Sequence, residues 1–214
     1  MICLKSSSSV LWPLESIIGE HATNCVAIIH PITQRNVRLM LSFLTKIFPP
    51  KPSKAAQTSY IALVAAARNH FFFSALGVPD TLDGRFELVA LHAFFLQHRL
   101  GQEQPEFARE LSECFFDDMD RSLRELGIGD TGVKRRVKTM AKAYHGRLQI
   151  YAAALREGDD ALRTALARNL YGTVAEGDVT ALAAMAEYVQ KTVAALTAIP
   201  AETIITNQWI WPTP

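Results

Sequence analysis

Residues 88 to 98 carry no formally charged side chain, and this run constrains the fold more than any other feature of the sequence. Apolar residues fall on nearly every face of the helix that the run would form, which a helix tolerates only when protein surrounds it. Just before the run, Pro79 fixes a turn, Asp80 is a suitable N-cap and Asp83 adds negative charge to the first helical turn. Residues 77 to 100 therefore predict a turn and a well-capped helix at the centre of an all-helical core.

The segments around this helix have helical periodicity, and none alternates as a strand would. The longest of them places Val133, Tyr144 and Tyr151 on one apolar stripe. Glycines and prolines separate the segments and mark their ends. We expect an all-α fold, a single helical bundle of about six helices with a flexible N-terminal extension. The helices expected around the central one cover residues 54–76, 106–126, 132–156, 159–171 and 178–198.

Details of these helices give further expectations. Phe71 falls on the core side of the first helix and Leu126 on the apolar side of the third. Asp130 or Thr131 should cap the longest helix. A glycine in mid-helix lowers stability by up to about 1 kcal/mol relative to alanine. Gly146 therefore suggests that another helix crosses closely at that point.

The ends of the chain differ in character from its centre. Residues 1–39 show neither helical nor strand periodicity, and Met40 opens a more regular pattern. We interpret residues 1–39 as a non-native or disordered extension, with a divergent targeting segment as the alternative. Residues 40–55 are interpreted as a short amphipathic segment with a proline-rich linker, 56–198 as the main helical domain, and 199–214 as a tail. Trp209 and Trp211 in this tail are expected to dock on the core.

Composition excludes several classes of protein. The chain has 49% hydrophobic and 20% charged residues, as ordinary globular proteins do. Its formal net charge is +1, so any attraction to nucleic acid or anionic lipid must be local. Cys3, Cys25 and Cys114 are isolated, which suits a reducing compartment and argues against a disulfide scaffold. No apolar run in the sequence approaches the roughly 20 residues that cross a bilayer.

The acidic run from Asp117 to Asp120 is the one candidate for metal chemistry. Isoprenoid synthases hold Mg²⁺ and a diphosphate with aspartates on one helix face, but Asp117 and Asp118 project about 100° apart and no second aspartate-rich helix follows. We predict no metal, no cofactor and no catalytic residue, with an isoprenoid-type enzyme using Asp117 and Asp118 as an alternative. Asp118 projects toward the apolar side of its helix, so we expect it to be partly buried beside a cationic or hydrogen-bonding partner.

The strongest local charge lies on the longest helix, where no acid occurs between Asp130 and Glu157. Arg135, Lys138 and Lys142 are the residues predicted to make electrostatic contact with RNA, phospholipid headgroups or an acidic partner. A solvated face neutralised by the preceding acidic helix is an equally good interpretation. In that case Asp117, Asp120 and Glu125 would supply the neutralising charges.

Charged residues also gather around the start of the central helix. One good N-cap already satisfies a helix end, so the charges there exceed what capping needs. We predict a polar cluster whose role is structural or directed at a client protein. Its expected members are Asp80, Asp83, Arg85, Asp118 and Arg124.

A series of sequence blocks carries a family resemblance. The first block is Gly77-Val-Pro-Asp-Thr-Leu-Asp-Gly-Arg-Phe, followed by Leu91-His92 and by Asp117 to Asp120 with Leu123-Arg-Glu. Gly129-Asp, Val133-Lys-Arg-Arg-Val-Lys-Thr-Met, Gly146-Arg, Tyr151 and Ala167-Arg-Asn-Leu-Tyr come next in order. Over roughly residues 56 to 172, these blocks resemble the ubiquinol-cytochrome c chaperone family.

The resemblance implies an assembly factor and not an enzyme. It implies binding of newly made cytochrome b, or of a small assembly partner protein, and work near a ribosome or an anionic membrane surface, without sequence-specific nucleic-acid binding. The short chain without a long targeting region resembles a bacterial member, for which we expect a cytoplasmic location or a peripheral one at the inner membrane. The family supplies no catalytic residues. A structural subunit of a respiratory or translational complex is the remaining alternative.

Overall fold

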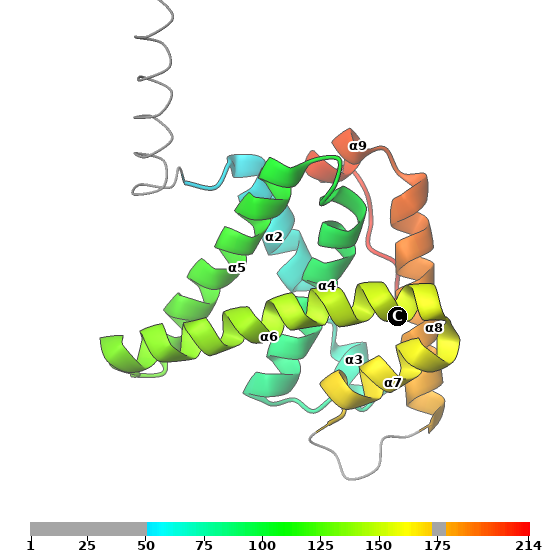
Figure 1. Ribbon diagram of the computed structural model, residues 1–214, viewed down its shortest axis with the longest axis horizontal. Coiled ribbons are helices and arrows are strands. Elements are labelled where there is room, and N and C mark those ends of the chain that lie inside the picture. The colour runs from blue at the N-terminus through cyan, green and yellow to red at the C-terminus, as the bar shows by residue number, and fades with distance from the viewer. Residues whose placement is uncertain (1–50, 173–178) are drawn as a thin grey trace, which may run out of the picture. The chain divides into compact units, whose positions relative to one another are not determined.

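The computed structural model describes residues 51–172 and 179–214, and every regular element in these ranges is a helix (Figure 1). The predicted all-α fold is thereby confirmed. The predictions for residues 1–39, and for the part of residues 40–55 that precedes residue 51, lie outside the described residues. The helices are α2 (Lys54–Ala67), α3 (His70–Ser74), α4 (Leu82–Leu100), α5 (Pro105–Glu125), α6 (Asp130–Glu157), α7 (Asp159–Leu170), α8 (Val179–Ala198) and α9 (Ala201–Ile205).

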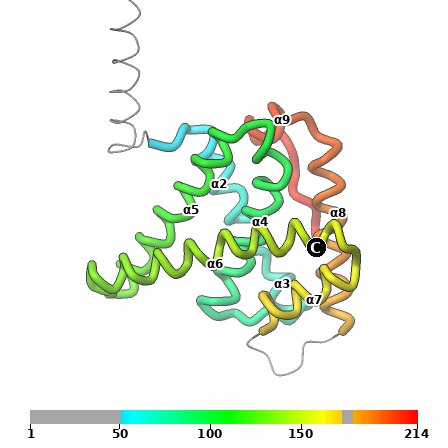
Figure 2. Tube along the Cα trace, in the orientation of Figure 1, coloured from blue at the N-terminus to red at the C-terminus, as the bar shows by residue number. Residues whose placement is uncertain are grey.

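α4 is the central helix, as its uncharged run predicts. Every residue from Phe86 to Leu96 is buried, and α4 packs against α2, α5, α6, α7 and α8. The long helix α6 crosses α4 in the trace of Figure 2. Because burial of one large apolar side chain stabilises a fold by about 1.5–3 kcal/mol, this helix supplies much of the core energy.

The start of α4 differs from its prediction at the cap. Thr81, and not Asp80, is the N-cap residue, and its hydroxyl accepts a hydrogen bond from the amide of Gly84. Asp80 instead pairs with Arg85. Both residue types cap well, so sequence preference alone did not decide between them.

The first predicted helix is two helices. α2 ends at Ala67, and the side chain of Asn69 accepts a hydrogen bond from the amide of Phe71 to begin α3. This break changes the helical register, because each residue turns by about 100° only within a continuous helix. Phe72 is consequently fully buried, and Phe71, predicted in the core, is 43% exposed.

α6 has the predicted apolar stripe but a different cap. Val133, Tyr144 and Tyr151 are all fully buried. The N-cap is Gly129, which makes no side-chain capping bond, and the proposed cap residues Asp130 and Thr131 already lie inside the helix. In place of a side-chain cap, the carboxylate of Asp130 lies in the first turn of α6, where its negative charge stabilises the helix start.

The tail docks on the core, as predicted for its tryptophans. The ring of Trp211 lies with its centroid 5.3 Å from that of His92 and 6.4 Å from that of Phe95. Trp209 packs on Trp211 with a centroid separation of 4.5 Å. The short helix α9, which the sequence did not predict, directs the tail back across α4 and contacts α2.

In the described part of the chain, no helix is both long enough and apolar enough to cross a membrane.

The prediction that a helix crosses closely at Gly146 is wrong, since a Cβ added there meets no atom within 4 Å. Replacing Gly146 by Ala should therefore raise the free energy of unfolding by about 0.5–1 kcal/mol, because alanine loses less backbone entropy in a helix. Urea denaturation followed by circular dichroism measures the change.

Gly84 gives the contrasting substitution within the same fold. A Cβ added at Gly84 would lie 2.0 Å from the carbonyl oxygen of Pro79, which belongs to the backbone and cannot rotate away. Replacing Gly84 by Ala should therefore destabilise the protein. Stabilisation by both substitutions, or by neither, would contradict this account of the two glycines.

Candidate functional site

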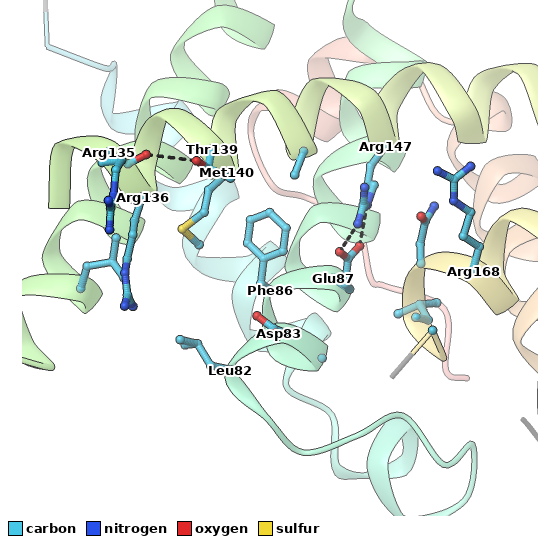
Figure 3. Close-up of a pocket in the computed structure, with 16 residues that line it drawn as sticks. Leu82, Asp83, Phe86, Glu87, Arg135, Arg136, Thr139, Met140, Arg147 and Arg168 are labelled. Carbon is cyan, nitrogen blue, oxygen red and sulfur yellow. Dashed lines mark hydrogen bonds and ion pairs between the residues drawn. The ribbon is translucent and has the colours of Figure 1, made fainter. Parts of the chain in front are cut away.

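A hollow with a volume of about 590 Å³ opens between the start of α4, the length of α6 and the end of α7 (Figure 3). Leu82, Phe86 and Met140 provide apolar walls, while Asp83 and Glu87 are its acids. Four arginines against these two acids leave a formal charge of +2 among the lining side chains. We call this hollow the arginine trough. Its arginines are Arg135, Arg136, Arg147 and Arg168.

One of the four arginines is committed to an internal ion pair. Arg147 Nη2 lies 2.6 Å from Glu87 Oε1, and Arg147 Nε donates to Glu87 Oε2 at 2.9 Å. The Glu87 side chain is only 10% exposed. The hydrogen bonds from Arg147 to Glu87 raise the pKa of the guanidinium. This bidentate pair joins α4 to α6, so the role we assign to Arg147 is to stabilise the packing of these two helices.

The predicted electrostatic residues lie along the outside of α6. Arg135, Lys138 and Lys142 are exposed, and their spacing of three and four residues puts them on one side of the helix. We call these three residues the basic face. Within residues 51–172 and 179–214, none of them has an acid at ion-pair distance. Only Arg135 also lines the arginine trough.

The acids that would have neutralised the basic face have other neighbours. Arg124 Nε lies 2.6 Å from Asp120 Oδ2, and Arg124 also pairs with Asp130. Asp117 is exposed in another hollow, together with Arg121. The basic face therefore keeps its positive charge toward solvent.

The residues predicted as one polar cluster lie in separate places. Asp80 and Arg85 form an exposed pair at 2.6 Å, and the hydrogen bond from Arg85 lowers the pKa of Asp80. Asp83 lines the arginine trough. Asp118, partly buried as expected, accepts a hydrogen bond of 2.9 Å from the hydroxyl of Tyr60. Arg124 joins the acids of α5 and α6, as described above.

An apolar groove with a volume of about 270 Å³ lies beside the trough, and Leu82, Phe86, Leu123 and Met140 line both hollows. Its other apolar side chains include Met119 and Leu126. Leu82 and Leu126 are 51% and 60% exposed. The prediction that Leu126 belongs to the apolar side of its helix is wrong, because Leu126 follows the end of α5 as its C-cap.

A third hollow lies between α2 and α5, with a volume of about 700 Å³. It shares Arg68 and Asp118 with the apolar groove, and Ile61 in its wall is 70% exposed. Burial raises the pKa of the Cys114 thiol in this hollow to about 11, so the thiol stays protonated near neutral pH. Exposed apolar side chains thus continue from α4 and α5 toward α2.

Metal-ligating side chains do not gather in the described ranges, where no group of three or more His, Cys, Asp or Glu side chains is placed to hold an ion. Of the aspartates in the isoprenoid alternative, Asp118 accepts a hydrogen bond from Tyr60 and Asp117 is exposed. What these surfaces can do chemically is bind. They offer exposed apolar side chains for a hydrophobic segment and guanidinium groups for carboxylates or phosphates.

Sequence reasoning missed the arginine trough itself. Arg136, Arg147 and Arg168 each stand in a block that carries the family resemblance, but no sequence pattern brings them together. Glu87 gave one usable signal, since it is the last acid before the uncharged run of α4. A carboxylate at the edge of a buried helix predicts a cationic partner, but nothing in the sequence identifies that partner.

The helical fold and its open hollows define an all-α protein suited to binding another protein. A family model described as "Ubiquinol-cytochrome C chaperone" matches residues 74–211, which include the arginine trough and most of the apolar groove. The chain therefore belongs to the ubiquinol-cytochrome c chaperone family.

Two relatives agree with this membership. The chain is 26% identical over 161 residues to the Xenopus laevis protein named ubiquinol-cytochrome-c reductase complex assembly factor 1, covering 73% of this chain and 80% of that protein. It also resembles the crystal structure of the Cbp3 homolog from Brucella abortus, with a TM-score of 0.67 and 34% sequence identity. That match covers 82% of this chain and 97% of the other.

Proposed function

We propose that this chain is an assembly factor for ubiquinol-cytochrome c reductase, which binds newly made cytochrome b or a small assembly partner protein. The family match over residues 74–211 is the observation that carries the proposal. The name of the Xenopus laevis relative, a reductase complex assembly factor, supports the same role.

The proposed mechanism is shielding of apolar client segments. The exposed side chains of Leu82, Leu126 and Ile61 lie in or beside hollows that an apolar segment of a client can enter. Covering such a segment removes apolar area from water, which contributes about 25 cal/mol per Å² to binding, against the entropy lost when the two proteins associate. The client is released when its own partner subunits bury the same surface.

The basic face orients the complex in this proposal. Arg135, Lys138 and Lys142 meet ribosomal RNA or an anionic membrane surface through charge alone, without reading a nucleotide sequence. The chain then works in the cytoplasm, or as a peripheral protein at the inner membrane, where new membrane subunits emerge.

A tagged pull-down from the source cells, followed by mass spectrometry, tests the role in assembly. We expect cytochrome b to be enriched without the mature subunits of the reductase. Recovery of the complete mature complex in equal amounts would instead identify a structural subunit. Recovery of neither cytochrome b nor an assembly partner would also contradict the proposal.

Reversing the charge of the basic face tests its orienting role. Changing Arg135, Lys138 and Lys142 together to Glu should lower co-sedimentation with ribosomes or anionic vesicles at low salt by at least tenfold, because the contact is electrostatic. Reversal of Lys51, Lys54 and Arg121, which are exposed cations outside α6, makes the same change in net charge and is the control. Equal losses in both variants would leave the basic face without a special role.

A further inference from the structure

Most of the arginines in the arginine trough have no ion-pair partner among the described residues. Arg147 is engaged by Glu87, but Arg135, Arg136 and Arg168 make no ion pair with any residue in the ranges that the structure describes. All three are exposed. A guanidinium presents a planar fork of donors that matches a carboxylate. These three side chains are therefore available to an anionic partner.

The cations are divided between the two ends of the trough. Figure 3 shows Arg135 and Arg136 on one side of Phe86, and Arg147 with Arg168 on the other. Because α6 rises about 1.5 Å per residue, the two ends of the trough, marked on α6 by Arg136 and Arg147, are roughly 16 Å apart along its axis. Arg147 is held by Glu87, so the available cation at its end is Arg168, which Figure 3 shows beyond Arg147 as seen from Phe86. A single phosphate or carboxylate therefore reaches only one end.

The middle of the trough favours a neutral, apolar occupant. Phe86 and Met140 lie between the two groups of arginines. Asp83 also faces this middle section, where its carboxylate repels another acid. The trough thus presents positive charge, then an apolar and weakly acidic section, then positive charge again.

We propose that the arginine trough binds an acidic segment of a partner protein, with carboxylates at two points about 16 Å apart and apolar side chains between them. An extended chain rises about 3.3 Å per residue, so roughly five residues separate the two acidic points. The inference rests on the proposed function, since the partner is a protein that acts with this chain in assembly. It adds the chemistry by which that partner is recognised.

Fluorescence anisotropy with the purified full chain tests this site directly. The probe is a labelled nonapeptide with two glutamates at each end and the sequence Leu-Thr-Val-Thr-Leu between them. We expect saturable binding that weakens at least tenfold when glutamine replaces the four glutamates. Changing Arg136 and Arg168 together to Glu should weaken binding of the acidic peptide by at least tenfold as well.

Changing Lys138 and Lys142 together to Glu is the matched control. It makes the same change in the net charge of the protein, but neither lysine lines the trough, so the affinity should fall less than threefold. Circular dichroism checks that both variants are folded. Equal weakening by the two variants would show general charge attraction and overturn the inference.

Vesicles containing phosphatidylglycerol distinguish a lipid occupant from a peptide. If Arg136→Glu with Arg168→Glu abolishes vesicle binding but leaves peptide binding intact, the trough is a lipid site and the proposal is wrong. Failure of the peptide to bind also overturns the proposal. Neither result affects the pull-down of cytochrome b, which tests the assembly role separately.

Discussion

Replacing Arg147 by Met should lower the free energy of unfolding by about 3–5 kcal/mol, the largest effect we expect from one substitution. The substitution leaves the carboxylate of Glu87 in a buried position without its cation. Glu87 is 10% exposed and receives both of its short contacts, at 2.6 and 2.9 Å, from Arg147. Without the guanidinium, Glu87 is a buried charge with no compensating partner. Urea denaturation at pH 7 measures the loss.

Two further variants separate this effect from simple loss of a cation. Changing Glu87 to Gln together with Arg147 to Met should recover most of the stability, because no buried charge remains. Lys191→Met is the control, since its pair with Glu187 is exposed on both sides and water screens it, so stability should hardly change. A loss below about 1 kcal/mol in Arg147→Met would show that the Glu87 carboxylate is well solvated without its partner.

Arg147 has two roles, because it pairs with Glu87 in the fold and also lines the arginine trough. Removal of Arg147 changes both the fold and the charge of the trough, so a loss of binding in that variant has two causes. Arg136 and Arg168 have no such structural partner within the described residues. They are therefore the positions at which binding can be changed while the helices stay packed.

The sequence predicts the central helix and the longest helix well because burial sets their composition. An uncharged run such as that of α4 forms a stable helix only when protein surrounds it. The apolar stripe on α6 repeats with the helical period, so it identifies the buried side of that helix. The break at Asn69 and the cap at Thr81 depend on single hydrogen bonds, to the amides of Phe71 and Gly84. Other residues nearby could have made equivalent bonds, so these details were not predictable.

The candidate site was less predictable than the fold because its residues come from distant segments. Glu87 and Arg147 are 60 residues apart in the sequence, and Arg168 joins them from α7. Periodicity places each residue on a face of its own helix, but not opposite a residue of another helix. Asp80 with Arg85 illustrates the contrary case, where five residues of separation allowed the pair to form locally.

His92 should make the protein less stable in mild acid. Its ring is fully buried, with Nδ1 2.8 Å from the carbonyl oxygen of Leu88 and Nε2 2.9 Å from the hydroxyl of Tyr188. Because a carbonyl only accepts, Nδ1 carries the proton and Nε2 accepts from Tyr188. Protonation of Nε2 would reverse that bond, so that Nε2 donates to the Tyr188 oxygen, and would place a positive charge in the core. Burial lowers the pKa of His92 to about 4.

The direction of the pH effect follows from this lowered pKa. Below about pH 6.5 the unfolded chain takes up a proton at this histidine, while the folded protein does not until about pH 4. Stability should therefore fall by about 2 kcal/mol between pH 8 and pH 5. The carboxyl groups with lowered pKa values, including Asp80 and Asp130, lose their contribution only in stronger acid. Urea denaturation at several pH values measures the slope.

His92→Gln isolates the contribution of this ring from that of its neighbours. Tyr188 is the titratable side chain bonded to His92, and burial raises its pKa, so it stays neutral throughout this range. His98 is exposed, but contact of its ring with the protein still lowers its pKa by desolvation, which adds a slope of the same sign. The Gln variant should be less stable at pH 8 but should lose most of the slope between pH 8 and pH 5. A variant with an unchanged slope would assign the acid sensitivity to His98 or another group, because the slope reports proton uptake independently of packing.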